Sequence, residues 1–238
     1  HIINKSLSTF ETYWASEDFE RFDGQAESTE KLNRALKQQK GLDAPGISHY
    51  FELTPFAHQK DILEQLAVER DLHQRFRNLV VAATGTGKTL ISAFDFQRFL
   101  KAKPNAHFLF VAHREEILRQ AREAYRGVLR NNAFGELWVG GKLPEHYRQL
   151  FVSIQTLNNQ LDQLKLTEDY YDYIVIDEVH HIAASSYRAV LEHFSPEILL
   201  GLTATPERHD GGDILCDFGG VIAAELRLPE AINRRHLC

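Results

Sequence analysis

The chain has 238 residues, 43% of them hydrophobic and 25% charged, a composition that excludes collagen-like, low-complexity and wholly disordered proteins. Because 27 Lys and Arg stand against 33 Asp and Glu, the formal net charge is −6, and any contact with a polynucleotide must be confined to a local groove. No apolar run approaches the ~18 residues of a membrane span, and the start of the chain lacks the pattern of an export signal, so we expect neither a membrane-spanning nor an exported protein.

The first 45 residues are predicted to form a helical appendage. Apolar residues recur at helical intervals over Ser6–Asp23, and a second, polar helix is expected over Glu27–Lys40. The turn-forming segment Gly41–Gly46 separates this appendage, residues 1–45, from the main domain, residues 46–238. The appendage has no phosphate-binding pattern, and we expect its aromatic residues to pack on another domain. Because the chain contains no methionine, we expect it to be an excerpt from a longer protein.

After Pro55 the hydrophobic pattern has the period of a helix over Ile62–Ala67 and then changes to short continuous apolar runs. These runs are Leu79–Ala82, Phe108–Val111, Leu150–Val152, Tyr173–Ile176 and Ile198–Leu200. Helical stretches such as Lys88–Leu100 and Glu115–Leu129 lie between them, and strands covered on both faces by helices are typical of parallel sheets. The sequence therefore predicts a three-layer α/β domain with a mostly parallel sheet.

The last stretch, Val221–Cys238, is predicted to contain a strand and the start of a helix. The only cysteines are Cys216 and Cys238, which are too few for a disulfide framework or a cysteine-rich zinc site. This usage of cysteine favours a reducing compartment, and we expect the protein in the cytoplasm.

A glycine-rich loop follows the first apolar run and opens a helix, with the sequence Ala82-Ala83-Thr84-Gly85-Thr86-Gly87-Lys88-Thr89. Gly85 and Gly87 allow backbone N–H groups to surround a phosphate chain at the helix start, where the helix dipole also favours negative charge. Lys88, expected as an exposed cation, would reach the β- and γ-phosphates, and the Thr89 hydroxyl would bind Mg²⁺. The pattern therefore predicts a nucleotide-binding P-loop, although Ala82 stands where the general pattern has glycine.

Two adjacent acids follow the run Tyr173–Ile176, in the sequence Asp177-Glu178-Val179-His180. They lie where a parallel sheet places its ligands, and two carboxylates there repel each other unless they share a cation. Asp177 suits the outer shell of Mg²⁺, and Glu178 suits a general base that takes a proton from the attacking water. We do not expect His180 and His181 to bind zinc, since no Cys or further His lies at the required spacing.

Together the P-loop, Asp177–His180 and Leu202–Pro206 resemble motifs I, II and III of superfamily 2 helicases, in the same order and with similar spacing. The resemblance extends from about Phe56 to the end of the chain. It is strongest to the branch shared by the helicase subunits of restriction enzymes and by related DNA repair translocases. It implies the first of two RecA-like lobes, with ATP and Mg²⁺ as cofactors and nucleic acid, in particular DNA, as the partner.

The resemblance also implies roles for residues outside the P-loop and the acidic pair. Gln59 matches the glutamine that reads adenine. Arg114, in a segment like motif Ia, and Gln155 with Thr156, in a segment like motif Ic, would contact the nucleic-acid backbone, for which their guanidinium, amide and hydroxyl groups are suited. These residues are thus candidates for base recognition and for phosphate contacts.

Motif III is expected to couple the chemistry to movement. Thr203 and Thr205 place hydroxyl groups at the end of a strand next to the strand of Asp177, where they could bond to the acidic pair and sense the γ-phosphate. His180 is included in the same coupling group. A polar turn is expected directly afterwards, over Glu207–Gly212.

Two further domains are implied by the resemblance. Motifs IV to VI, with the arginine finger, belong to a second lobe, and none is recognisable after Pro206. A phospholipase D-like nuclease domain often precedes the motor in similar proteins, and the aromatic residues Phe10, Tyr13, Trp14 and Phe19 are similar to its end. Its His-x-Lys signature is absent, so no nuclease residue is assigned.

Two other functions remain open at this point. A regulatory P-loop NTPase that never touches nucleic acid would explain motifs I and II but not Leu202–Pro206 or the Gln59 segment. A passive nucleic-acid-binding module would need a degenerate ATP site, whereas Lys88, Asp177 and Glu178 are all present. The leading hypothesis is the ATP-binding lobe of a nucleic-acid-dependent ATPase, a helicase or double-strand translocase related to DNA repair or restriction.

Overall fold

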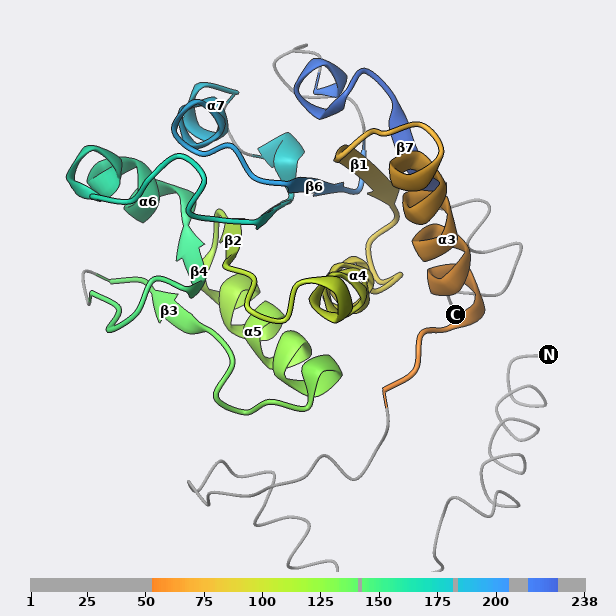
Figure 1. Ribbon diagram of the computed structural model, residues 1–238, viewed down its shortest axis with the longest axis horizontal. Helices are drawn as coiled ribbons and strands as arrows, with labels where there is room; N and C mark the ends of the chain where they lie inside the picture. Colours follow the sequence, from red (N-terminus) through yellow and green to blue (C-terminus); the bar gives the residue numbers. More distant parts are fainter. Residues whose placement is uncertain (1–52, 141–142, 182–183, 206–213, 227–238) are drawn as a thin grey trace, which may run out of the picture. The chain divides into compact units, whose positions relative to one another are not determined.

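The structure is a computed structural model that describes residues 53–140, 143–181, 184–205 and 214–226. Helices and strands alternate along these residues (Figure 1). The helices are α3 (Ala57–Asp71), α4 (Lys88–Ala102), α5 (Glu115–Leu129), α6 (Ile154–Gln160) and α7 (Ala184–His193). The strands are β1 (Arg77–Ala82), β2 (Phe108–Ala112), β3 (Glu136–Trp138), β4 (Gln149–Ser153), β5 (Tyr173–Asp177), β6 (Ile198–Thr203) and β7 (Ile222–Leu226).

The seven strands form one sheet in the order β3-β4-β2-β5-β6-β1-β7, and every neighbouring pair is parallel. Helices α3, α4 and α5 cover one face of the sheet, and α6 and α7 cover the other (Figure 1). The predicted three-layer α/β fold is confirmed.

Successive residues of each strand enter two separate cores, because strand side chains alternate between faces. On β1, Val80 packs in the core beneath α3, α4 and α5, whereas Leu79 and Val81 pack in the core beneath α6 and α7. All three are at most 1% exposed. Burial on both faces explains why the strands read as continuous apolar runs rather than as alternating patterns.

The parallel sheet brings the carboxyl ends of its strands to one edge. Ala112 at the end of β2 pairs with Ser153 at the end of β4, and Asp177 at the end of β5 pairs with Leu202 on β6. Val81 of β1 in turn pairs with Thr203 of β6. The segments that follow these strands therefore meet at this edge, where open α/β sheets bind ligands.

The elements that the sequence predicted and the structure describes agree closely. The helix predicted at Glu115–Leu129 is α5, the one at Lys88–Leu100 is most of α4, and β7 lies in the predicted Val221–Cys238 stretch. The sequence analysis missed β3, α6 and α7. The predicted helices in residues 1–45, the Glu207–Gly212 turn and the end of the Val221–Cys238 stretch lie outside the described residues.

Candidate nucleotide-binding site

The P-loop joins β1 to α4 through two glycines in the left-handed region of the backbone. Gly85 has φ of +87° and Gly87 has φ of +79°, which side chains other than glycine's rarely permit. A Cβ atom at Gly87 would also lie 2.5 Å from Gln59 Nε2. The Thr86 hydroxyl donates to the Ala83 carbonyl at 2.7 Å and closes the loop on itself. The loop is therefore compact, as are loops that bind an anion through their backbone N–H groups.

Lys88 lies at the first position of α4 and is 8% exposed, so the expectation of an exposed cation is wrong. Its Nζ donates to the Ala82 carbonyl at 3.1 Å and lies 4.0 Å from Glu178 Oε1. The Ala82 carbonyl and the Glu178 carboxylate together compensate the positive charge of Lys88, which is largely removed from water. Thr89 follows in the same helical turn and is half-buried.

Asp177 and Glu178 lie at and just beyond the end of β5, next to Lys88. The Glu178 N–H donates to Asp177 Oδ1 at 2.8 Å, and Asp177 is 4% exposed. Burial, followed by the negative charge of Glu178, raises the pKa of Asp177 to about 7, against the opposing effect of Lys88. A cation shared by the pair would favour the ionised form of Asp177.

Glu178 has φ of +53°, which is rare for a residue with a side chain. Such a conformation costs about 1–3 kcal/mol and persists only where the surroundings enforce it. Its carboxylate lies between two nitrogen groups, with Oε1 4.0 Å from Lys88 Nζ and Oε2 3.4 Å from His180 Nδ1. The unusual backbone thus aims this side chain along the edge of the sheet that carries the P-loop.

Thr203 was expected to bond to the acidic pair, but within the described residues its hydroxyl contacts His180 and Thr205 instead. The Thr203 hydroxyl donates to the Thr205 carbonyl at 2.6 Å and lies 2.8 Å from His180 Nδ1. The same His180 nitrogen is 3.4 Å from Glu178 Oε2. His180 therefore lies between Glu178 and Thr203 and contacts both.

Gln59 attaches the start of α3 to the P-loop and is 1% exposed. Its Nε2 donates to the Thr86 carbonyl at 3.2 Å, and its Oε1 accepts from the Phe56 N–H at 3.0 Å. His58, which the sequence analysis did not single out, also lies with Nε2 3.1 Å from the Thr86 carbonyl. The Phe56 ring is 67% exposed and stacks on His58 with ring centroids 6.0 Å apart. Phe56, an aromatic residue three positions before Gln59, was the sequence signal for this exposed ring.

The candidate nucleic-acid residues follow two paired strands at the same sheet edge. Arg114 is exposed at the start of α5, after β2, and Gln155 is exposed on α6, after β4. Thr156 is half-buried, and its N–H and hydroxyl both bond to the Ser153 hydroxyl, at 3.1 and 2.8 Å. Ser153 therefore caps α6 and holds Thr156 in place.

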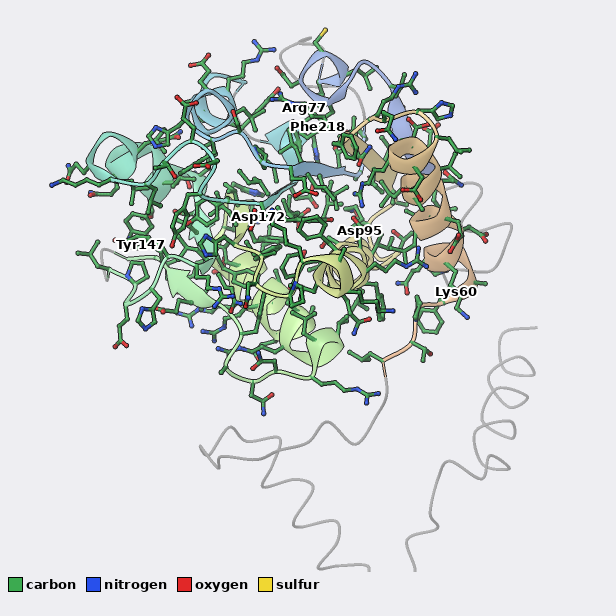
Figure 2. All side chains as sticks on the ribbon, in the orientation of Figure 1. Lys60, Arg77, Asp95, Tyr147, Asp172 and Phe218 are labelled. Atoms are coloured by element: carbon green, nitrogen blue, oxygen red, sulfur yellow. The ribbon has the colours of Figure 1, made fainter. Side chains whose placement is uncertain are left out.

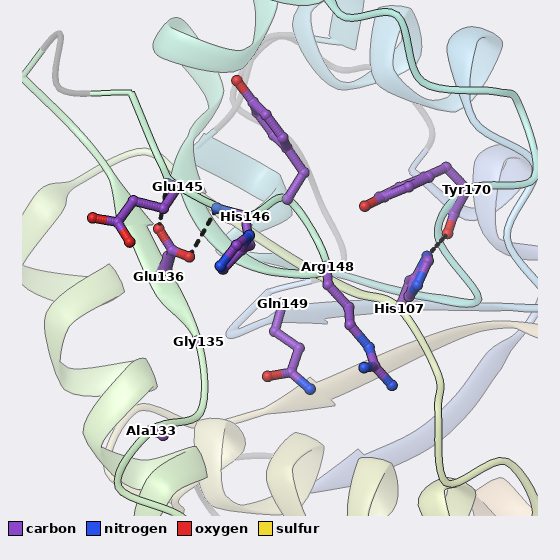
Figure 3. Close-up of a pocket in the computed structure, with 10 residues that line it drawn as sticks. His107, Ala133, Gly135, Glu136, Glu145, His146, Arg148, Gln149 and Tyr170 are labelled. Carbon is purple, nitrogen blue, oxygen red and sulfur yellow. Dashed lines mark hydrogen bonds between the residues drawn. The ribbon is translucent and has the colours of Figure 1, made fainter.

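A separate pocket of about 600 Å³ lies where strands β2 to β5 begin, at the opposite edge of the sheet (Figure 3). Within it, Glu136 accepts the N–H groups of Glu145 and His146 at 2.7 and 2.9 Å, and His107 Nδ1 lies 2.8 Å from the Tyr170 carbonyl. None of the residues predicted from the motifs lines this pocket. The candidate nucleotide site is therefore not this cavity.

We predict that Asp177→Asn stabilises the nucleotide-free chain in a pH-dependent way. An Asp with a pKa near 7 in the folded chain and near 4 when unfolded contributes stability below pH ~4 that is lost as the pH rises to 7. Asn does not ionise, so the gain of the variant over the parent should grow to at most about 4 kcal/mol above pH 7. Melting temperatures of the variant and the parent at pH 5 and pH 8, with a chelator present to remove divalent cations, measure this gain.

The matched control is Asp61→Asn, which makes the same substitution at an exposed position of α3. An Asp177→Asn gain that was equal at both pH values would contradict the assignment of a raised pKa to Asp177.

The fold, the family that matches the chain and its helicase relatives define the described part of the chain as a first RecA-like lobe of the superfamily 2 helicase type. The family model described as the res subunit of type III restriction enzymes matches residues 52–208, and the chain belongs to that family. The domain is thus an ATPase domain of the helicase/translocase type.

Individual relatives are consistent with this family. The chain is 33% identical to irc3 of Schizosaccharomyces pombe over 158 residues. This aligned region covers 61% of this chain and 25% of that protein. It is 32% identical over 148 residues to the type I restriction enzyme EcoAI endonuclease subunit of Escherichia coli, with 56% and 17% covered. The chain therefore spans about a quarter or less of these relatives.

Solved structures show the same fold. The helicase domain of Pyrococcus furiosus Hef superimposes with a TM-score of 0.59 at 22% identity, over 75% of this chain and 40% of that one.

Within the residues that the structure describes, no helix is both long and apolar enough to cross a bilayer.

Proposed function

We propose that the chain is the ATP-binding lobe of a DNA-dependent ATPase that works as a helicase or double-strand translocase. The observation that carries this proposal is the convergence of Gln59, Lys88 and Glu178 on one glycine-rich loop. The three side chains suit the base, the phosphates and the attacking water of a nucleoside triphosphate. The family supports the use of ATP.

The residues at the loop fit Mg²⁺ as well as ATP. The Thr89 hydroxyl and the Asp177 carboxylate are hard oxygen donors of the kind that Mg²⁺ prefers, and Asp177 would act through the outer shell. Mg²⁺, when bound, neutralises charge on the phosphate oxygens. Lys88 would exchange its bond to the Ala82 carbonyl for the β- and γ-phosphates.

Glu178 performs the proton transfer in the proposed reaction. The oxygen of a water attacks the γ-phosphorus, the water's proton passes to a Glu178 carboxylate oxygen, and the bond to the β–γ bridging oxygen breaks. ADP leaves with the bridging oxygen. His180 lies near both Glu178 and Thr203, so we propose that these contacts transmit the state of the γ-phosphate to β6 and to Thr205.

DNA would lie along the same edge of the sheet. Arg114, Gln155 and Thr156 offer polar groups for phosphate oxygens, and we assign them no base-reading role. Similar structures include a SWI2/SNF2 ATPase core solved in complex with double-stranded DNA, at a TM-score of 0.57 and 18% identity. The proposal further includes a second lobe with an arginine finger, an upstream phospholipase D-like nuclease domain, a boundary near residue 45 and a cytoplasmic location.

The first test is Lys88→Ala in a thermal-shift titration with ATP and Mg²⁺. The parent should gain stability as the ligand saturates, about 2.7 kcal/mol at 100 times the dissociation constant. The variant should lose most of this gain, because the loop keeps its backbone groups but lacks the cation. Lys101→Ala, at an exposed position in the last turn of α4, is the control and should respond as the parent does. Equal stabilisation of Lys88→Ala and its parent would refute the phosphate site.

The second test measures ATP turnover of the full-length protein with and without duplex DNA. Stimulation by DNA is expected. ATP turnover that DNA leaves unchanged would favour a regulatory NTPase instead.

A further inference from the structure

A buried polar network joins α3 to the interior of the domain. Arg70 donates from Nη1 and Nη2 to the two carboxylate oxygens of Asp95, at 2.8 and 2.7 Å, and from Nε to Asn78 Oδ1 at 2.8 Å. The Tyr173 hydroxyl donates to Asp95 Oδ2. Each hydrogen-bonding nitrogen of the guanidinium thus has a defined partner, in the bidentate geometry that gives an Arg–carboxylate pair its directional strength.

Three members of the network are almost fully buried: Asp95, Asn78 and Tyr173 are 3%, 1% and 0% exposed, and the Arg70 side chain is 11% exposed. Asp95 lies on α4, in the interior of the domain (Figure 2). Burial lowers the pKa of Arg70, but Asp95 and then Tyr173 raise it above its ordinary value, so the guanidinium remains charged. A buried ion pair of this kind adds little net stability compared with apolar packing, whereas its geometry fixes one arrangement of the groups that carry it.

The four members lie on four different elements, and each element carries part of the proposed site. Helix α3 has Gln59 in its first turn, β1 leads into the P-loop, α4 follows the P-loop, and β5 ends at the acidic pair. Arg70 and Gln59 are eleven residues apart on α3, about 16 Å along a helix axis. The helix is thus attached at one end to the P-loop, through the Thr86 carbonyl, and at the other to α4, through Asp95.

Three apolar side chains anchor α3 in the core of the domain. Ile62, Leu63 and Leu66 are its buried apolar residues, while Val68 is 44% exposed. Apolar contact is not directional, whereas the hydrogen bonds of Arg70 to Asp95 and Asn78 set the position of the helix along its axis. The position of Gln59 relative to the P-loop therefore depends on the Arg70 end of the helix.

We propose that Arg70 and Asp95 are positioning residues for base selection, which hold Gln59 at the distance from the P-loop that adenine recognition requires. The inference rests on the proposed role of Gln59. Arg70 and Asp95 contact neither base nor phosphate. Loosening their pair lets α3 shift, and adenine then loses its advantage over a purine with different edge groups.

The test compares the selectivity of the full-length protein for ATP over GTP, as the ratio of the two kcat/KM values. Arg70→Lys keeps the charge but removes the bidentate geometry, and we expect the ratio to fall about three- to tenfold, the loss of roughly one net hydrogen bond. Tyr173→Phe removes one bond to Asp95 but leaves the ion pair, so it should lower the ratio less. Unfolded molecules hydrolyse neither nucleotide, so the ratio does not depend on how much of a variant is folded.

The matched control is Arg98→Lys. Arg98 on α4 also bonds to α3, through Glu64 Oε1 at 3.0 Å and the Leu63 carbonyl at 3.2 Å, but the side chains of Arg98 and Glu64 are 41% and 70% exposed. The ratio of the kcat/KM values for ATP and GTP in Arg98→Lys should equal that of the parent, because an exposed ion pair contributes little to the position of a helix.

Two results would overturn the proposal. One is an Arg70→Lys variant that loses activity toward ATP and GTP by the same factor, which indicates a purely structural pair. The other is a parent protein that hydrolyses both nucleotides without preference. A parent that hydrolyses neither would instead overturn the proposed function, and this inference with it.

Discussion

Replacing Glu178 with Gln should lower the ATP turnover of the full-length protein by about 10²–10⁴ while ATP binding persists. The amide has nearly the same shape but does not take the proton of the attacking water. It also removes the negative charge that helps to raise the pKa of Asp177, so Asp177 should ionise more easily. Steady-state turnover measures the loss of catalysis, and an ATP-binding isotherm of the same preparation shows whether binding persists.

Glu192→Gln supplies the matched control, since Glu192 is exposed on α7, on the side of the sheet away from α4. Its turnover should equal that of the parent. Unchanged turnover in Glu178→Gln would mean that another group takes the proton, whereas loss of ATP binding would mean that Glu178 mainly supports the P-loop.

The 238-residue chain alone should hydrolyse ATP about 10³–10⁵ times more slowly than the same lobe joined to a second lobe, because an arginine finger contributes a factor of this size where it has been measured. Lys88, Thr89, Asp177 and Glu178 supply the remaining charges. With one wall of the site open to water, each contact to the phosphates is also weakened. Half of the groove for DNA would be missing too, so binding through Arg114 and Thr156 should be weak and sensitive to salt.

The measurement compares turnover of the isolated chain with that of a protein extended through a second lobe, each with and without duplex DNA. A Lys88→Ala version of both proteins corrects for contaminating ATPases. If the isolated chain matched the extended protein and responded to DNA, the two-lobe mechanism would be wrong.

The sequence predicted the structure best where a local conformation or environment requires one type of residue. Glycine at 85 and 87 is required by a left-handed backbone, and five apolar runs matched strands because both faces of the sheet are covered. The three-residue β3 carries too short a pattern to detect. The Arg70–Asp95 pair was beyond reach, since no local pattern specifies which residues of two separate helices meet.

Side-chain partners at the site were also harder to predict than the site itself. Lys88 lies at the P-loop as predicted, but its bond to the Ala82 carbonyl was not predicted. Thr203 contacts His180 rather than the two acids. Such choices depend on differences of an ångström between strand ends, which a motif does not encode. The roles assigned to these residues remain predictions.

The left-handed backbone at Glu178 has a consequence for attempts to engineer the domain. Glycine or asparagine adopts this conformation more easily than glutamate, and either would also remove a negative charge next to buried Asp177. A library screened only for resistance to heat should therefore enrich Glu178→Asn or Glu178→Gly and discard the proposed base. Thermostabilised versions of this motor lobe will need a screen for turnover at every round, or a fixed codon at this one position.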